Sequence, residues 1–261
     1  MSENIELKPM TVDRIRDYPS LLTRLDNCLD GTGKTISIGE FPGAGRKYDC
    51  RKIVLGKGNP LRVLISAGIH GDEPAGVETV CEFLESERYK KYLDRWEFTI
   101  LPCLNPSGYE LGGRENHREQ DLNRLFKSED PPPEVVFAKS VFVHSYTLTL
   151  ELHEDTESPG YYLYQKTSPE LEEGPGRPLL NSVKEIMPIN MDSDIDGTEA
   201  CEGLIDRLKG PEDMEWWPMA LFAVSRGAEC CLTLESAMKF PMETRISAHL
   251  RAVQKALDFF S

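Results

Sequence analysis

The chain has 261 residues, of which 39% are hydrophobic and 28% charged, which is typical of a soluble globular protein. Its formal net charge of −14 argues against nucleic acid as a partner, because phosphate binding needs a surface rich in Lys and Arg. No apolar run approaches the roughly 18 residues that span a bilayer, and the charged N-terminal segment does not resemble a signal peptide. We therefore expect a soluble, cytoplasmic protein without a membrane partner.

The seven cysteines are an odd number and lack CxxC spacing. Several occupy apolar, strand-like runs, as Cys103 does in TILPC and Cys230 and Cys231 do in AECCLTLE. Buried free thiols in a reducing compartment explain this pattern better than disulfides or a cysteine metal site do.

Hydrophobic periodicity predicts alternating strands and helices along the chain. In chain order we expect a helical lead-in over 1–33, strands at 35–39, 50–56 and 62–68, a helix at 75–94, a strand at 97–103, a helix at 134–146, a strand at 147–153, weaker helices at 178–187 and 217–226, a strand at 230–236 and a helix at 242–260. Several strands are nearly continuous apolar runs, which is typical of strands buried on both faces.

This alternation predicts an α/β fold, a three-layer αβα sandwich with a mostly parallel (mixed) central sheet. No linker composition divides the chain, so a single domain over 1–261 is the simplest organisation. The acidic stretch NMDSDIDGTEACEG within 188–215 lacks a Glu at the twelfth position of a calcium loop. We expect an acidic surface loop there.

The most informative segment is SAGIHGDEPAG, residues 66–76, where a predicted strand ends and a helix follows through Pro74. His70 and Glu73 lie in the turn, outside the carboxyl end of the strand, where functional groups of open α/β sheets collect. An imidazole and a carboxylate at this spacing can bind one zinc ion, although the HxxE pattern alone is weak.

Two further polar residues end apolar strands. His153 ends the strand in LELHEDT, and Glu235 ends the strand in LTLES. Two histidines and one carboxylate with an open fourth position are the composition of a catalytic zinc site rather than a structural one.

In this order the motifs resemble those of the zinc carboxypeptidase superfamily. They are His70-Gly-Asp-Glu73, Asn105-Pro-Ser-Gly108, Asp121-Leu-Asn-Arg124, Leu152-His153 and Leu234-Glu235, all within 62–236. The similarity is greatest to the short bacterial-type branch, to which murein-peptide amidases belong and to which the succinylglutamate desuccinylase and aspartoacylase deacylases are related. Five motifs in order are specific, whereas none of them is specific alone.

The resemblance implies a role for each matching residue. It makes His70, Glu73 and His153 the ligands of one Zn²⁺ ion, and Glu235 the general base and acid. It also implies that Arg114 stabilises the oxyanion and that Asn123 and Arg124 bind the terminal carboxylate of the substrate.

Several assignments stay open. Arg118 lies four residues after Arg114 and is the alternative oxyanion stabiliser. The acidic pair Glu154 and Asp155 could support a second metal or orient His153. Three other histidines, His117, His144 and His249, are not expected to be ligands. The side chains of Trp216 and Trp217 fit either a substrate cleft or the core. A tyrosine of the family pattern is missing, and Tyr161, Tyr162 or Tyr164 could replace it.

We expect a metallocarboxypeptidase that acts on a small peptide or acyl amino acid. The alternatives are an N-acyl amino acid deacylase, a murein-peptide amidase, and a catalytically inactive peptide-binding relative. The short segment from Ser236 to Ser261 leaves no room for the extra β-domain of many aspartoacylase-like deacylases, which favours the peptidase. Neither the side-chain preference nor the oligomeric state follows from the sequence.

Overall fold

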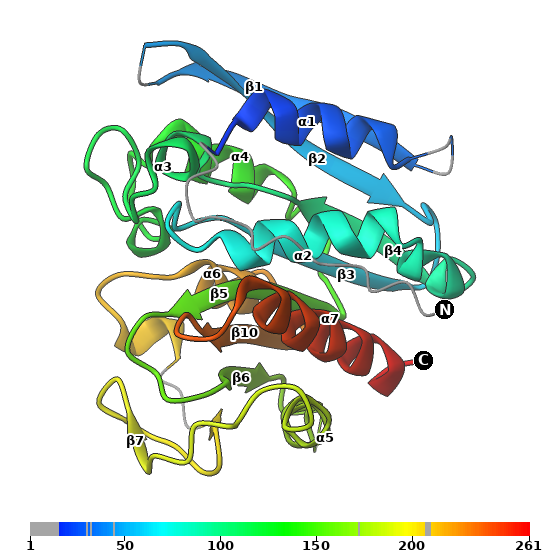
Figure 1. Cartoon of the computed structure of the whole chain (residues 1–261), viewed down its shortest axis with the longest axis vertical. Coiled ribbons are helices and arrows are strands. Elements are labelled where there is room, and N and C mark those ends of the chain that lie inside the picture. Colours follow the sequence, from blue (N-terminus) through cyan, green and yellow to red (C-terminus); the bar gives the residue numbers. More distant parts are fainter. Residues whose placement is uncertain (1–15, 30, 32, 44, 172, 207–209) are drawn as a thin grey trace, which may run out of the picture.

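The computed structural model describes residues 16–29, 31, 33–43, 45–171, 173–206 and 210–261. At its centre lies an eight-stranded sheet with the order β1-β2-β4-β3-β5-β10-β6-β9 (Figure 1). The strands are β1 Gly33–Pro42, β2 Lys47–Leu55, β3 Leu61–Ala67, β4 Trp96–Leu101, β5 Leu148–Asp155, β6 Tyr162–Thr167, β9 Leu204–Ile205 and β10 Cys230–Ala237. A separate hairpin joins β7 Asp194–Ile195 to β8 Thr198–Glu199.

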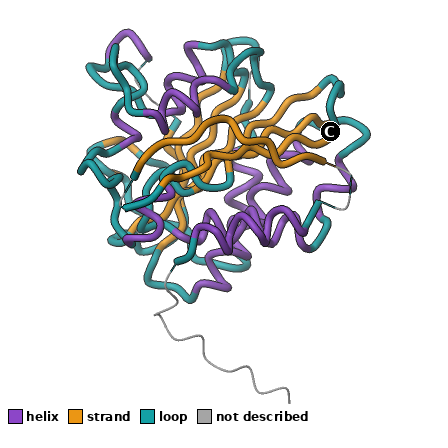
Figure 2. The backbone as a smooth tube through the Cα atoms, turned by 90° about the horizontal axis from the view of Figure 1, so that it is seen from above, coloured by secondary structure: helices purple, strands orange, loops and turns teal. Residues whose placement is uncertain are grey.

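The helices are α1 Tyr18–Asn27, α2 Pro74–Glu85, α3 Pro106–Leu111, α4 Pro133–Ser140, α5 Gly176–Val183, α6 Met219–Ser225 and α7 Met242–Phe259. Short 3-10 turns lie at Arg88–Tyr92, Leu122–Arg124 and Pro211–Asp213. Helix α7 packs against α2 and α5 along one face of the sheet, whereas α6 packs on β5 and β10 and α4 on β1. Figure 2 shows the sheet between the two helical layers.

The four central strands β4, β3, β5 and β10 run parallel, and β2 and β6 pair antiparallel at their two sides. The expected α/β sandwich with a mixed sheet is thus confirmed. Because parallel strands end at the same edge, the segments that follow β3, β4, β5 and β10 all meet there.

Burial explains why the central strands read as continuous apolar runs. On β5, Leu148, Leu150 and Leu152 face the larger core under α2 and α7. Leu64 of β3 and Cys231 of β10 face a second core, which α4 and α6 cover. Strands with a core on each face have no solvent side on which to place alternating polar residues.

Some expected boundaries are wrong. The helix expected over 134–146 ends at Ser140, after which the Tyr146 hydroxyl donates to the Val141 carbonyl at 2.9 Å and folds the chain back. The helix expected over 75–94 ends at Glu85, because Glu87 adopts a left-handed φ of 56°. Strand β5 continues two residues beyond the expected end, to Asp155, and β10 continues one residue beyond, to Ala237.

Other elements went unpredicted. Residues 162–167, for which no element was expected, form β6, and the acidic stretch expected to be a surface loop contains the β7–β8 hairpin. Helix α1 lies within the expected N-terminal lead-in, whereas residues 1–15, 30 and 32 of that lead-in fall outside the described residues. Cysteines 50, 81, 103, 230 and 231 are buried free thiols. Among the described residues no helix is long and apolar enough to cross a membrane.

The Leu150 side chain, fully buried on the central strand β5, provides a test of the core. Leu150→Ala should lower the free energy of unfolding by about 2–5 kcal/mol, because it removes apolar contacts and leaves a cavity. Val143→Ala is the control: this side chain is 74% exposed, so its loss should change stability by no more than about 0.5 kcal/mol. Urea unfolding measures both, and equal losses in the two variants would contradict the described core.

Candidate metal centre

The turn between β3 and α2 positions His70 and Glu73. A side-chain carbon on Gly71 would lie 1.9 Å from the carbonyl carbon of Gly108, so only glycine lets this turn lie directly against α3. Pro74 then begins α2 with the fixed φ that suits the first helical position. The turn is therefore held by backbone packing on one side and by a helix start on the other.

His153 and Glu235 come from the neighbouring strands. In the parallel pair β3–β5, Ala67 lies opposite Leu152, so His153 follows at the edge where the β3–α2 turn begins. In the pair β5–β10, Glu235 lies directly opposite His153. Since directly opposed residues of a pleated sheet point to the same face, Glu235 and His153 share one face of the sheet.

The carboxylate of Glu73 lies between the two histidines. Its Oε1 is 2.6 Å from Nδ1 of His70, and its Oε2 is 2.8 Å from Nδ1 of His153. All three side chains are buried, and their potential ligand atoms lie within 4.8 Å of one another. The three residues are thus brought together as a possible metal site.

The electrostatics of this cluster favour a cation at its centre. Burial raises the pKa of Glu73, but His153 and His70 outweigh it and hold that pKa at about 2. Burial lowers the pKa of His153, yet Glu73 and Glu151 together raise it well above its ordinary value. The ionised Glu73 carboxylate stabilises a positive charge on the neighbouring imidazole. It would stabilise a metal ion between the same ligand atoms in the same way.

A second layer of carboxylates faces the outer nitrogens of the histidines. Nε2 of His70 is 3.3 Å from Oδ1 of Asp121, and Nε2 of His153 is 3.9 Å from Oε2 of Glu151. Glu151 is 2% exposed, and neither of its oxygens has a hydrogen-bond partner among the described residues. Carboxylates at this position fix the tautomer of a metal-binding imidazole. The donors therefore fit a metal that binds through both Nδ1 atoms.

Neither outer carboxylate was singled out from the sequence. Asp121 opens the DLNR motif, and Glu151 precedes His153 by two residues, on the same face of β5. That period-2 spacing was the available signal for Glu151, whereas the contact between Asp121 and His70 spans 51 residues and needs the fold.

The acidic pair after His153 has structural partners. Glu154 accepts a hydrogen bond from the backbone N–H of Ala75 at 2.6 Å, in the first turn of α2, and pairs with Arg245 of α7. Asp155 accepts from the Tyr162 hydroxyl at 2.9 Å and from two backbone N–H groups of the next turn. Glu154 thus supplies the helix start with an anionic acceptor from outside the helix.

His249 of α7 supports His153 from behind. Its Nε2 lies 3.0 Å from the His153 carbonyl and its Nδ1 lies 3.0 Å from the Tyr161 hydroxyl. Burial lowers the pKa of His249 to about 3, so the ring is neutral and donates through Nε2 to the carbonyl. His144 is exposed and His117 bonds through its backbone N–H to the Ser107 hydroxyl. The structure places none of these three imidazoles in the cluster of ligand atoms.

Arg114 reaches the cluster. Its Nε donates to Asp121 Oδ2 at 3.1 Å, and its Nη1 lies 3.5 Å from Glu73 Oε1. The side-chain amide of Asn105 donates to the Arg114 carbonyl at 3.2 Å, which ties the NPSG motif to this arginine. Arg118 is exposed, and its backbone N–H bonds to Asn116. Between the two arginines, the geometry favours Arg114.

Asn123 and Arg124 lie on the 3-10 turn that follows Asp121. The side-chain oxygen of Asn123 accepts from the backbone N–H of Met219 at 2.9 Å. The guanidinium carbon of Arg124 lies 4.1 Å from the ring centroid of Trp216. Trp217, by contrast, packs against the second core and donates through Nε1 to the Pro211 carbonyl.

Glu235 lies between His153 of β5 and Tyr162 of β6, with which it is also in register. Burial raises the pKa of this half-buried carboxyl well above its usual range, an effect that His153 opposes. The hydroxyls of Tyr162 and Tyr164 are both used, since they donate to Asp155 and Asp196 at 2.9 Å each. Both tyrosines lie on β6.

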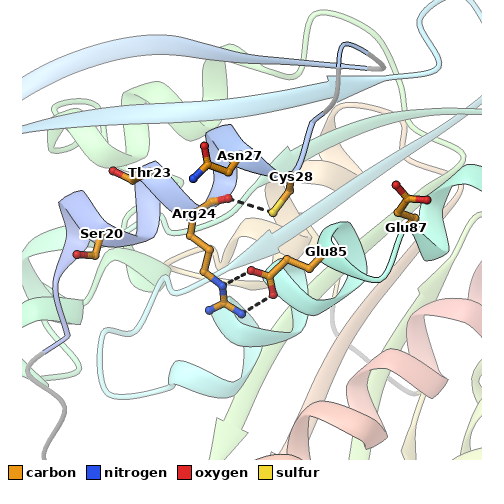
Figure 3. Close-up of a pocket in the computed structure, with 7 residues that line it drawn as sticks. All are labelled: Ser20, Thr23, Arg24, Asn27, Cys28, Glu85 and Glu87. Carbon is orange, nitrogen blue, oxygen red and sulfur yellow. Dashed lines mark hydrogen bonds and ion pairs between the residues drawn. The ribbon is translucent and has the colours of Figure 1, made fainter.

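A surface hollow of about 570 Å³ between α1 and α2 lies away from this cluster (Figure 3). The Arg24 guanidinium in it is already neutralised by Glu85 and by Glu78, the latter at 2.6 Å. Glu85 follows Glu73 by twelve residues along α2, which corresponds to about 18 Å at 1.5 Å per residue. The hollow therefore contributes nothing to the metal cluster.

Solved structures share this fold. A candidate metallopeptidase from Shewanella amazonensis SB2B is 22% identical, with a TM-score of 0.80 over 94% of each chain. A metallo-carboxypeptidase from Burkholderia cenocepacia is 18% identical, with a TM-score of 0.67 over 94% of this chain and 70% of that one. Bovine thrombin-activatable fibrinolysis inhibitor, solved with a tick carboxypeptidase inhibitor, is 17% identical, with a TM-score of 0.63 over 93% of this chain and 94% of that one.

At these identities the similarity shows a carboxypeptidase-like fold alone. No curated protein sequence matches the chain. Residues 59–259, which include every motif from the β3–α2 turn to α7, match the family model of the succinylglutamate desuccinylase/aspartoacylase catalytic domain. The chain therefore belongs to the succinylglutamate desuccinylase/aspartoacylase catalytic-domain family.

Proposed function

We propose that this protein is a zinc-dependent hydrolase that cleaves an amide bond next to a free carboxylate, as a metallocarboxypeptidase does. The observation that carries the proposal is the convergence of His70, Glu73 and His153 at one edge of the sheet, with Glu235 opposite His153. The family match and the carboxypeptidase-like fold of its neighbours support the same chemistry.

His70, Glu73 and His153 would hold the zinc ion. When bound, zinc supplies a Lewis acid that makes a water molecule acidic enough to attack near neutral pH. Glu235 accepts the proton of that water and donates it to the leaving nitrogen. The burial that raises the pKa of Glu235 helps the second of these transfers, because a carboxyl that holds its proton more tightly can serve as the acid.

The two arginines have separate tasks in this scheme. Arg114, beside Glu73, directs a guanidinium at the carbonyl oxygen, where negative charge develops as water attacks. Arg124 and the NH₂ group of Asn123 bind the substrate carboxylate, for which a guanidinium edge has matching donor geometry. The distance between the two guanidinium groups would select substrates by the position of their carboxylate.

The second candidate function is deacylation of an N-acyl amino acid. The observation in its favour is the family match, because the family is described by two such deacylases. Both candidates release a product with a free carboxylate and use the same residues. A panel of dipeptides with varied C-terminal residues, together with N-acyl amino acids, distinguishes them by relative kcat/KM.

Metal binding is the first testable consequence. The purified protein should bind about one zinc ion per chain, and His153→Gln should lose it. Asp121→Asn and Glu151→Gln should keep the site but bind zinc about 10- to 100-fold more weakly, because each removes the negative charge that faces the outer nitrogen of a ligand imidazole. Chelator competition measures the affinity, and His144→Gln is the matched control. Unchanged affinity in both carboxylate variants would contradict the second layer.

Proton transfer by Glu235 is the second testable consequence. Glu235→Gln should lower kcat by about 100- to 10,000-fold while the zinc content stays the same, because the amide cannot accept the proton of water. Glu229→Gln, an exposed residue just before β10, is the control and should retain full activity. Full hydrolysis by zinc-loaded Glu235→Gln would overturn this mechanism.

Carboxylate recognition by Arg124 is the third testable consequence. Arg124→Ala should lower kcat/KM for a free-acid substrate by about 10- to 100-fold, the effect of losing charged hydrogen bonds. The C-terminal amide of the same substrate should be cut equally slowly by both forms. The exposed Arg226→Ala serves as the control. A wild-type enzyme that cleaves acid and amide at the same rate would remove this role.

A further inference from the structure

The indole of Trp216 covers one face of the Arg124 guanidinium. The guanidinium carbon is 4.1 Å from the ring centroid, well inside the approximately 6 Å range of cation–π contacts. Trp216 is also 39% exposed, which is high for so large an apolar side chain. Its ring thus lies at the surface, against a charged partner rather than in either core.

The backbone holds this stack in place from both sides. Before Trp216, the Met214 carbonyl accepts from the Lys127 ammonium at 2.6 Å. After it, the Trp217 carbonyl accepts from the Phe126 N–H at 3.2 Å, and the Met219 N–H donates to Asn123 at 2.9 Å. The segment that carries Trp216 is therefore fixed to the turn that carries Arg124, so the fold determines where the backbone of Trp216 lies relative to this arginine.

The edge of the Arg124 guanidinium remains available. Its one hydrogen bond among the described residues is a long contact of 3.4 Å from Nη1 to the Asn123 carbonyl, and within that part of the chain it forms no ion pair. Arg114 differs, because its Nε donates to Asp121 at 3.1 Å and its Nη1 lies 3.5 Å from Glu73. A guanidinium with a covered face and a free edge is prepared for a planar, bidentate anion.

We propose that Trp216 is a positioning residue for Arg124, which holds the guanidinium plane so that its edge meets the substrate carboxylate. This inference rests on the proposed function, because it takes Arg124 as the carboxylate anchor. The indole limits the rotation of a long, flexible side chain and removes water from one face of the charge. Carboxylate binding should therefore weaken when the ring is removed, while the chemical step is unaffected.

The kinetic test compares a free-acid substrate with its C-terminal amide. Trp216→Ala should raise KM for the acid about 3- to 10-fold, leave kcat within about twofold, and not change kcat/KM for the amide. Trp216→Phe keeps an aromatic face and should retain most of the affinity. The double variant with Arg124→Ala should lose no more than Arg124→Ala alone. Met191→Ala, which removes another exposed apolar side chain, is the control.

A binding test decides the inference even if no hydrolysis is found. The Nε–H resonance of Arg124, assigned by its loss in Arg124→Lys, should be displaced by the indole ring current and move in Trp216→Ala. Titration of the zinc-loaded protein with N-acetylglycine should shift this resonance, whereas N-acetylglycinamide should not. Affinity for the acid should fall about 3- to 10-fold in Trp216→Ala.

Different results would contradict the positioning role of Trp216 and the proposed hydrolase function. Equal affinity for N-acetylglycine in wild type and Trp216→Ala, or no binding of the acid in wild type, would overturn the positioning role whatever the enzyme hydrolyses. Binding that depends on Trp216 without hydrolysis of any substrate in the panel would support the positioning role and remove the proposed function.

Discussion

The site depends on one constraint, the parallel pairing of β3 with β5 in the register that sets Ala67 opposite Leu152. This register brings His153 beside the turn after β3, so that the Glu73 carboxylate contacts an imidazole on each side. A shift of one residue would turn His153 toward the opposite face of the sheet. The buried leucines of β5 fix the register, because the same shift would move them out of the larger core.

The elements around this pair hold the ligands rather than add to them. Helix α7 contributes His249 to the His153 carbonyl and Arg245 to Glu154, whose other oxygen accepts from the first turn of α2. On the opposite side, Asp121 connects His70 to Arg114. These hydrogen bonds give buried polar groups the partners that they need. Without partners, groups removed from water would lower the stability of the fold.

The sequence predicted the sandwich, six of the eight strands of its central sheet and the cluster of His70, Glu73 and His153, because local apolar runs and ordered motifs indicate them. Contacts between distant residues were not predicted: Asp121, Arg245 and the ring of Trp216 have partners 51 to 92 residues away. The amphipathic pattern also predicted a helix as far as residue 146. In the structure α4 ends at Ser140, and the Tyr146 hydroxyl donates to the Val141 carbonyl beyond that end. The choice between Arg114 and Arg118 needed the turn that Asn105 holds.

The most direct test of the metal centre is the anomalous diffraction of zinc in crystals of the metal-loaded protein. The arrangement predicts one strong peak about 2.0–2.2 Å from Nδ1 of His70, Nδ1 of His153 and a carboxylate oxygen of Glu73, with both Nε2 atoms still facing Asp121 and Glu151. A peak elsewhere in the molecule, or ligation through Nε2, would contradict the account of the site.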